Sequence, residues 1–302
     1  MSTLTQTDLG PTTPADQPAA APPGRTGRSP FAPQGVGRVL TGILLTVGAL
    51  ATLFPFYAMV VLSLKPNGGL FFPGSLVPND LTLDNYARVL QGNQVIRWAL
   101  NTLLYSGISV VFVLLLSSMA GYAFAKKRFP GKNVIFWSFL GMLMVPYHIT
   151  LIPLFVIVAK ADGVNTYWGL IVPTLANAQA TFLMRQFIRG IPDELLDAAR
   201  VDGASEFRIF AQIVLPLCKP ILATLGLFVF LWHWNDFLWP LVVAQSPEMQ
   251  MLTTGIAGLM QDKVPMSVAM AGSVVALAPI FVAYLFAQRH FTEGATMSGL
   301  KG

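Results

Sequence analysis

The sequence has few charged residues and a single cysteine. Of its 302 residues, 11% are charged, whereas a soluble domain carries about 25%. Hydrophobic residues make up 54% of the chain, and the mean hydropathy is +0.61. Cys218 alone cannot form an intrachain disulfide or a cysteine zinc cluster. These shortages exclude an ordinary soluble domain and predict a membrane protein.

Motifs for catalysis and nucleotide binding are missing as well. The sequence contains no Gly-x-x-x-x-Gly-Lys-Ser/Thr loop, no Gly-x-Ser-x-Gly and no His-Glu-x-x-His, so nothing in it cradles a triphosphate or marks a hydrolase. Its three histidines are scattered, and no metal site is expected. We therefore expect a chain that is not an enzyme, binds no cofactor itself, and relies on another chain for any ATP hydrolysis.

Several apolar runs are long enough to cross a hydrocarbon layer of about 30 Å, which takes roughly 20 helical residues. They do not alternate apolar and polar residues as the strands of a β-barrel would. The predicted fold is therefore all-α and integral to the membrane, with six transmembrane helices. The six runs are Val39–Leu64, Trp98–Ala125, Val134–Ala159, Tyr167–Met184, Leu217–Val243 and Ser267–Ala287.

The distribution of positive charge predicts the orientation. With six spans, 14 of the 19 Lys and Arg residues fall on the side of the N-terminal tail, and positive residues stay cytoplasmic. Both termini are expected inside, with the protein spanning the lipid of the cytoplasmic membrane. The cations flank spans, so no nucleic-acid partner is expected. Residues 1–36 are predicted to be a disordered cytosolic tail before a transmembrane domain at 37–302. Ala49-Leu50-Ala51 resembles a signal-peptide cleavage site, but its apolar run is too long for an h-region.

Residues 190–216 form a strongly polar helical stretch between two apolar runs. Pro192, followed by two acidic residues, predicts the start of a helix. Gly203 can take the left-handed conformation that ends a helix, and Ser205 can cap a second helix that runs towards Pro216. The pattern predicts a helix, a tight turn and a second helix.

Two surfaces are predicted for this loop. The second helix carries apolar residues at helical spacing, which would dock on the protein's own spans. These residues are Phe207, Phe210, Ile213 and Val214. The first helix combines small residues, over which another backbone can approach, with charged hydrogen-bonding groups. These residues are Asp197, Ala198, Ala199, Arg200 and Asp202. The same features fit an ordinary amphipathic helix at the membrane surface, and the residues alone leave both interpretations open.

Residues 197–216 resemble the EAA loop of binding-protein-dependent ABC importer permeases. Asp197, Ala198 and Ala199 stand at the Glu-Ala-Ala positions, Gly203 at the turn glycine, and Leu215-Pro216 at the end of the motif. Asp197 departs from the pattern, because it is one methylene shorter than the usual Glu. Further stretches narrow the resemblance to the maltose-type carbohydrate permeases. They are Leu81–Tyr86, Phe129–Lys132, Val145–Pro153, Leu183–Phe187, Trp234–Pro240 and Gly299–Gly302.

This resemblance implies the type I importer permease fold and a role in ATP-driven sugar import. The partners that it implies are a second, homologous permease subunit in a heterodimer, two copies of an ABC ATPase that binds ATP and magnesium, and an external sugar-binding protein. The loop at 190–216 would be the coupling helix that sits in a cleft of the ATPase and drives alternating access. The loop at 244–265 would probe the cleft of the sugar-binding protein.

Polar residues inside the apolar runs are candidates for the transport path. A charge at the bilayer centre costs roughly 2.5 to 3.5 kcal/mol on insertion scales, so Asp236 must pair, face water or lie near an interface. His233 and Asn235 flank it among tryptophans, which also fits an interfacial aromatic belt. His148 and Asn101 could line a path or serve packing and interhelical hydrogen bonds. A secondary carrier or channel with Asp236 as its ion site, or a polytopic membrane enzyme, remain alternatives.

Overall fold

A computed structural model describes residues 36–66, 73–91, 94–261 and 264–298. Two compact units divide the chain, Met1–Leu53 and Phe54–Gly302. In the first unit only the start of helix α1 (Val36–Ser63) is described, and the helix continues into the second unit. The predicted disordered tail lies, up to residue 35, outside the described residues. The account below concerns the second unit.

Helices make up this unit, and the described residues contain no strand. Several of them begin where a proline, a glycine or a capping side chain interrupts the backbone pattern. The α-helices after α1 are α2 (Asp84–Gln91), α3 (Gln94–Lys126), α4 (Lys132–Gly141), α5 (Tyr147–Lys160), α6 (Tyr167–Ile171), α7 (Ala178–Arg189), α8 (Asp193–Val201), α9 (Glu206–Ile209), α10 (Leu215–Leu217), α11 (Lys219–Trp234), α12 (Leu238–Val243), α13 (Leu252–Gln261) and α14 (Met266–Ser298). Short 3-10 turns occupy Gly74–Leu76, Met142–Met144 and Val172–Thr174, and a π-helical turn occupies Phe210–Val214.

Two helices, α1 and α3, are long and apolar enough to cross a membrane unbroken. Two further spans are possible if α4 with α5, bent by 105°, and the α9–α10 segment with α11, bent by 77°, each count as one. The apolar part of α14, Met266–Val282, is shorter. These assignments rest on length and composition within the described residues. The prediction of a helical, membrane-embedded protein is confirmed. The count of six transmembrane helices remains a prediction.

Three of the six predicted runs are not single helices. The run at 134–159 breaks before Tyr147, where Pro146 is extended (φ −61°, ψ 128°), because proline removes an amide donor and fixes φ. The run at 167–184 consists of α6, a 3-10 turn and α7, with a break at 175–177. The run at 217–243 is interrupted at 235–237, between α11 and α12. Hydropathy reports the apolar length of a segment and does not see such breaks.

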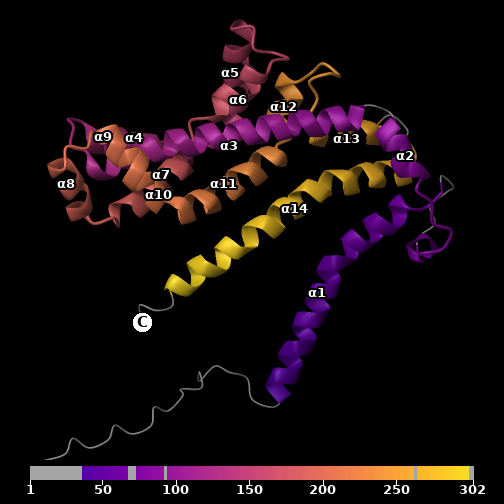
Figure 1. The fold of residues 1–302 in the computed structure, drawn as a ribbon. Helices are drawn as coiled ribbons and strands as arrows, with labels where there is room; N and C mark the ends of the chain where they lie inside the picture. Colours follow the sequence, from indigo (N-terminus) through magenta and orange to yellow (C-terminus); the bar gives the residue numbers. More distant parts are fainter. Residues whose placement is uncertain (1–35, 67–72, 92–93, 262–263, 299–302) are drawn as a thin grey trace, which may run out of the picture. The chain divides into compact units, whose positions relative to one another are not determined.

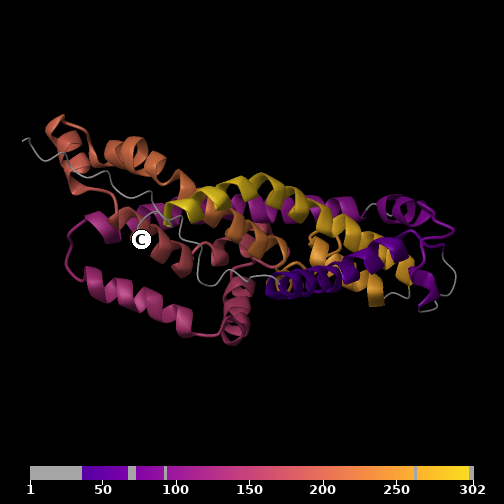
Figure 2. The ribbon, with the colours of Figure 1, turned by 90° about the horizontal axis from the view of Figure 1, so that it is seen from below.

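Helix α3 is the central element of the second unit. It packs along α7 and α11, and α11 packs in turn on α14 (Figures 1 and 2). The two helices α3 and α7 approach closely at Gly121, where an added Cβ would lie 2.8 Å from Cβ of Met184 and 3.0 Å from the amide nitrogen of Arg185. One apolar cluster joins these helices to the 190–216 loop at one end of α3, and two others lie further along it.

Candidate functional site

The 190–216 loop is a helix, a tight turn and a second helix, as predicted. Pro192 was predicted as the first helical residue, but it stands at the N-cap (φ −57°, ψ 135°), and α8 begins one position later at Asp193. Gly203 has φ +79°. Its amide donates to the carbonyl of Arg200 (3.0 Å), and the amide of Ala204 donates to that of Ala199 (2.9 Å). These two bonds form a Schellman motif, which requires the left-handed residue that glycine supplies.

The second helix of the loop begins as predicted and then changes its period. The Oγ of Ser205 accepts the amide of Arg208 (3.3 Å) and caps α9. After Ile209 the backbone takes a π-helical turn, in which the spacing of residues on one face is wider than in an α-helix. Ile209 and Val214, five residues apart, are both fully buried. The shift in period therefore decides which residues face the protein.

Two predictions for this loop are wrong because of how it packs. Phe207 does not belong to the buried face, since its side chain is 74% exposed. Ala199 does not offer its surface to another chain, since it packs in the cluster that contains Leu196, Phe210 and residues of α7. Ala198 is exposed. The docked face of the loop therefore includes part of the first helix and excludes the start of the second.

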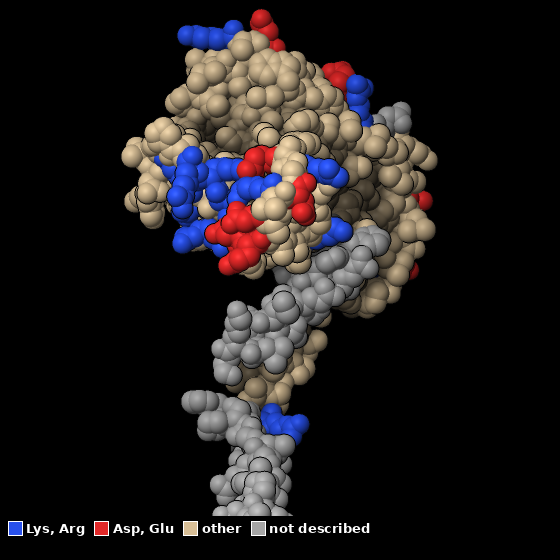
Figure 3. All heavy atoms as spheres, turned by 60° about the vertical axis from the view of Figure 1, so that its left-hand side comes forward, with Lys and Arg blue, Asp and Glu red and all other residues tan. Residues whose placement is uncertain are grey.

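Ion pairs fasten the loop to the end of α3. The Nζ of Lys126 donates to the carbonyl of Ile191 (2.5 Å) and pairs with Asp193 (2.8 Å). Lys127 pairs with Glu206, which also accepts the hydroxyl of Tyr122 (2.9 Å). Figure 3 shows cationic and anionic side chains gathered at this end of the molecule. Motion of the loop must therefore carry the end of α3 with it.

A second bridge closes the loop on itself. Arg200 donates through Nε to Glu206 (3.1 Å) and through Nη1 to Asp197 (2.5 Å). The bond from Lys127, followed by those from Tyr122 and Arg200, holds the pKa of Glu206 down at about 2. Asp197 and Arg200 are thus already partners of each other, and Asp202 is exposed beside them.

Apolar side chains on the outer surface of the loop are the feature that sequence reasoning missed. Val201 is 88% exposed, and Phe207 and Leu195 are exposed as well. These residues flank the Gly203 turn on an otherwise charged segment. Exposed apolar groups rimmed by charge are typical of a protein-binding surface. The wider spacing of a π-turn could not be read from the sequence, so Phe207 was assigned to the interior.

The predicted path residues fall into two groups. Four of them lie along a chain of ring contacts and hydrogen bonds between α5 and the α11–α12 break. The ring centroids of His148 and Tyr147 lie 6.0 Å apart, those of Tyr147 and Trp232 5.9 Å, those of Trp232 and His233 5.0 Å, and those of His233 and Tyr105 5.0 Å. The hydroxyl of Tyr105 then donates to Oδ2 of Asp236 (2.9 Å), beside Asn235. Tyr105 and Tyr147 had no sequence signal, because aromatic residues in apolar runs usually serve packing.

Burial separates these residues further. His233 is buried, with its ring nitrogens bonded to the carbonyl of Val229 (2.8 Å) and the hydroxyl of Thr174 (3.1 Å). His148 and Asn235 are exposed, and Asp236 is half-buried. The hydroxyl of Tyr147 is buried without a hydrogen-bond partner. Within the described residues, no three His, Cys, Asp or Glu side chains are grouped as metal ligands.

Asn101, the fifth path candidate, lies elsewhere and holds a loop. Its Nδ2 donates to the carbonyls of Glu248 (2.8 Å) and Gln250 (2.9 Å), and its Oδ1 accepts the hydroxyl of Tyr167 (2.7 Å). The neighbouring Thr102 accepts the amide of Leu252 (2.8 Å). Asn101 is therefore a buried clamp for the segment 244–252, at the start of the 244–265 loop.

Comparisons with known proteins agree with this architecture. A permease protein of an arabinooligosaccharide transport system from Halalkalibacterium halodurans is 39% identical over 268 residues, covering 86% of this chain and 96% of the relative. An sn-glycerol-3-phosphate transport system permease protein from Pectobacterium atrosepticum is 33% identical over 266 residues, covering 85% and 95%.

A solved structure shares the fold. It is a crystal structure of a bacterial ABC transporter involved in the import of the acidic polysaccharide alginate, with a TM-score of 0.77 and 24% identity, covering 87% of this chain and all of that one. The family model for the inner membrane component of binding-protein-dependent transport systems matches residues 113–295, which include the whole 190–216 loop. By this match and by its relatives, the chain belongs to the family of binding-protein-dependent transport system inner membrane components.

Proposed function

We propose that this chain is a permease subunit of an ATP-driven importer for a carbohydrate. We further propose that the 190–216 loop contacts a separate ATPase and transmits its conformational change to the membrane-spanning helices. The relatives named for arabinooligosaccharide transport support a sugar or an oligosaccharide as the cargo. The glycerol-3-phosphate relatives leave a polyol phosphate as the second candidate. ATP and magnesium would be bound by the ATPase.

One observation carries the proposal: the 190–216 loop has a docked inner face and an uncovered outer one. Its base is fixed to α3 by Lys126 and Lys127 and to α7 by apolar packing. Its outer surface presents Val201 and Phe207 to whatever approaches. Force applied there would pass into α3 and α7, because packed interiors transmit displacement. Rocking of those helices would open an internal cavity first to one side of the membrane and then to the other.

The assembly that fits this geometry has several chains. A second, homologous permease would complete the path, two ATPase copies would engage one loop each, and an external binding protein would deliver the sugar. Positive charge distribution supports insertion in the cytoplasmic membrane as six spans with both termini inside. In that orientation the 190–216 loop faces the cytoplasm and the 244–252 segment faces outside.

Site-directed crosslinking tests the loop's role. Cys218 is fully buried, so Val201→Cys and Phe207→Cys each add one accessible thiol to the full chain. We expect both to crosslink to the ATPase in membranes, with yields that change when ATP is added. Lys160→Cys, an exposed position at the end of α5, is the matched control. Equal crosslinking of the ATPase at Lys160→Cys, or none at either loop position, contradicts the proposal.

The polar cluster near the α11–α12 break is the proposed stretch of the sugar path. Asp236 and the unpartnered hydroxyl of Tyr147 offer an acceptor and a donor to sugar hydroxyls, with Trp232 as an exposed ring beside them. Asp236→Asn should raise the sugar concentration needed for half-maximal uptake while ATP hydrolysis stays responsive to the loaded binding protein. Uptake that continues in vesicles without any ATPase would instead support an ion-driven carrier.

A further inference from the structure

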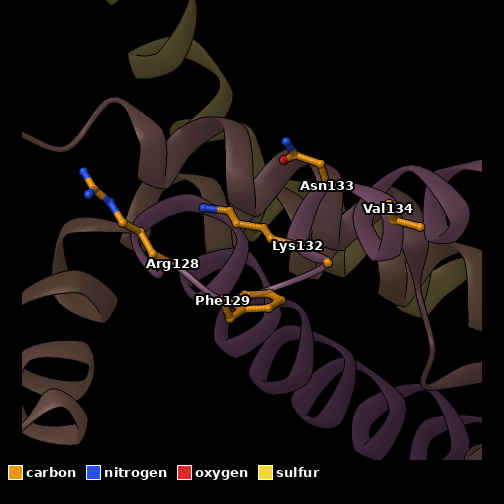
Figure 4. A pocket seen from close by; sticks show the side chains of 6 residues that line it. Arg128, Phe129, Lys132, Asn133 and Val134 are labelled. Carbon is orange, nitrogen blue, oxygen red and sulfur yellow. The ribbon is translucent and has the colours of Figure 1, made fainter.

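A pocket opens in the turn between α3 and α4, beside the 190–216 loop. Its volume is about 420 Å³, and it is an open depression in the surface. Figure 4 shows the Arg128 and Lys132 side chains extending from this turn. Gly131, at φ +76°, lets the chain reverse and start α4 at once. The lining residues are Arg128, Phe129, Gly131, Lys132, Asn133 and Val134.

Four cations gather around this pocket, and we call them the basic cluster. Arg128 and Lys132 come from the pocket itself, and Arg185 and Arg189 come from the last turns of α7. Arg128, Arg185 and Arg189 each lie within electrostatic reach of Lys132. Like charges held this close repel one another, and a bound anion would relieve that repulsion.

Nearby carboxylates do not neutralise the basic cluster. Asp193 pairs with Lys126, and Glu206 is bonded by Lys127 and Arg200. Arg128 is close enough to contribute to the lowered pKa of Asp193, but the two form no ion pair. Among the described residues, no member of the basic cluster has an acidic partner.

Two members of the basic cluster are fixed and two are free. Lys132 donates to the carbonyl of Lys127 (2.7 Å). Arg185 donates to the carbonyl of Phe124 (3.2 Å) and lies 3.9 Å from the ring centroid of Phe136. Arg128 and Arg189 are exposed, and the side chain of neither makes a hydrogen bond in the described part of the chain. The cluster thus combines two cations that are held in place with two whose side chains are free to move onto a bound anion.

The start of α4 adds donors to the same place. No side chain caps this ten-residue helix. The amide of Lys132 donates to the carbonyl of Phe129 (3.4 Å), whereas the next two amides, of Asn133 and Val134, lack the acceptor that a capping side chain usually supplies. An anion at this end would accept them and would also complement the helix dipole. Val134, Ile135 and Trp137 follow directly and are exposed apolar residues. The basic cluster therefore lies where the surface changes from charged to apolar, as at a lipid–water boundary.

We propose that the basic cluster binds the phosphate of an anionic phospholipid, whose acyl chains lie along the exposed apolar residues of α4. Phosphate chemistry follows from four cations and free helix amides, and the lipid source follows from the apolar surface that begins beside them. The bound headgroup would hold the α3–α4 turn next to the ion pairs of the 190–216 loop. The inference does not depend on which solute is carried.

Native mass spectrometry of the full chain tests this site. The chain is reconstituted in bilayers of phosphatidylethanolamine with phosphatidylglycerol, extracted into detergent, and the retained lipids are counted. The double variant Arg128→Gln, Arg189→Gln removes two positive charges of the basic cluster without breaking a side-chain hydrogen bond. Arg97→Gln with Lys160→Gln removes the same charge from exposed positions away from the basic cluster. Gel filtration and helical content show that each variant is folded.

We expect one phosphatidylglycerol retained by the natural chain and by the control pair. The Arg128→Gln and Arg189→Gln pair should bind it about thirtyfold more weakly, since each Lys or Arg near an anionic surface contributes about 1 kcal/mol and two are removed. Equal retention by both double variants overturns the proposal. Displacement by millimolar inorganic phosphate overturns the lipid assignment, because a free anion then suffices. Retention of phosphatidylethanolamine at the same level also overturns it.

Discussion

Both the 190–216 loop and the 244–252 segment pack in apolar clusters. In addition, ion pairs at its rim hold the 190–216 loop to its unit, whereas neutral hydrogen bonds in the interior hold the 244–252 segment. In the first, Lys126 and Lys127 at the end of α3 engage exposed carboxylates of the loop. In the second, Asn101 and Thr102 are buried and bind backbone groups. Exposed ion pairs are individually weak, and buried hydrogen bonds are costly to lose. The rim contacts of the first loop are therefore easier to exchange than the interior contacts of the second segment.

The largest expected effect separates the two loops by function. Gly203→Val should lower uptake by about tenfold or more, because the left-handed conformation costs an L-residue about 1–2 kcal/mol and a β-branched one more. An added Cβ meets nothing within 4 Å, so backbone strain alone is tested. We expect ATP hydrolysis and membrane insertion to persist while sugar uptake in vesicles falls by that factor.

Gly203→Asn is the matched control, since asparagine tolerates the left-handed region. It should retain most uptake. If Gly203→Val transports normally, or if both variants lose uptake equally, the turn conformation is not what couples this loop to its partner.

The next effect concerns the 244–252 segment. Asn101→Leu leaves the carbonyls of Glu248 and Gln250 and the hydroxyl of Tyr167 without their partner. We expect a loss of about 2–3 kcal/mol in unfolding free energy, because buried polar groups without partners are costly. Hydrogen exchange over 244–252 should speed up while that over 190–216 stays unchanged.

Gln245→Leu is the control for this prediction, because the exposed Gln245 side chain bonds only to the carbonyl of Val242. It should leave exchange in the segment unaltered. Equal acceleration in both variants would show that Asn101 has no special part in holding the segment.

A smaller effect tests the link between the loop and the spans. Gly121→Ala should destabilise the protein by about 1–3 kcal/mol, because the new methyl group meets the backbone of α7 and backbone cannot step aside. Gly107→Ala, on the same helix with nothing within 4 Å, should be neutral or stabilising by up to about 1 kcal/mol. The thermal unfolding midpoint in detergent should fall for Gly121→Ala and should stay or rise for Gly107→Ala. An equal fall in both variants would contradict close packing at Gly121.

Local chemistry explains which features of the 190–216 loop the sequence could predict. The Gly203 turn and the Ser205 cap depend on one or two residues each, and both predictions are confirmed. The faces of the helices depend on their period, which the π-turn changes, so Phe207 and Ala199 were misplaced. The residues of a turn determine the turn themselves, whereas the buried face of a helix depends on the surface against which the helix packs.

Long-range contacts set the other limit. The bond from Asn101 to Glu248 joins residues 147 positions apart, and no local pattern announces it. Residue types did mark Asn101 and Asp236 as polar groups in apolar runs, and the structure gives each a hydrogen-bond partner. The motif at 197–216 predicted the family, and membership of that family decides against the carrier and membrane-enzyme alternatives.

The smallest effect is a pH dependence of the ion pairs in the 190–216 loop. Glu206 has its pKa lowered from 4.5 to about 2, so its stabilising contribution is complete above pH 4.5 and is lost as the pH falls towards 2. The contribution is at most about 1 kcal/mol, because Glu206 is half exposed and solvent screens it. Glu206→Gln should therefore be slightly less stable than the natural chain from pH 5 to 8.

Thermal unfolding of both proteins across pH 3 to 8 isolates this residue, since all other carboxylates titrate in both. The gap between the two midpoints should be constant above pH 5 and should shrink as the solution is acidified, because protonated Glu206 and glutamine are both neutral. A gap that widens on acidification would mean that Glu206 is more stable protonated, and that Lys127 and Arg200 do not hold it as the geometry shows.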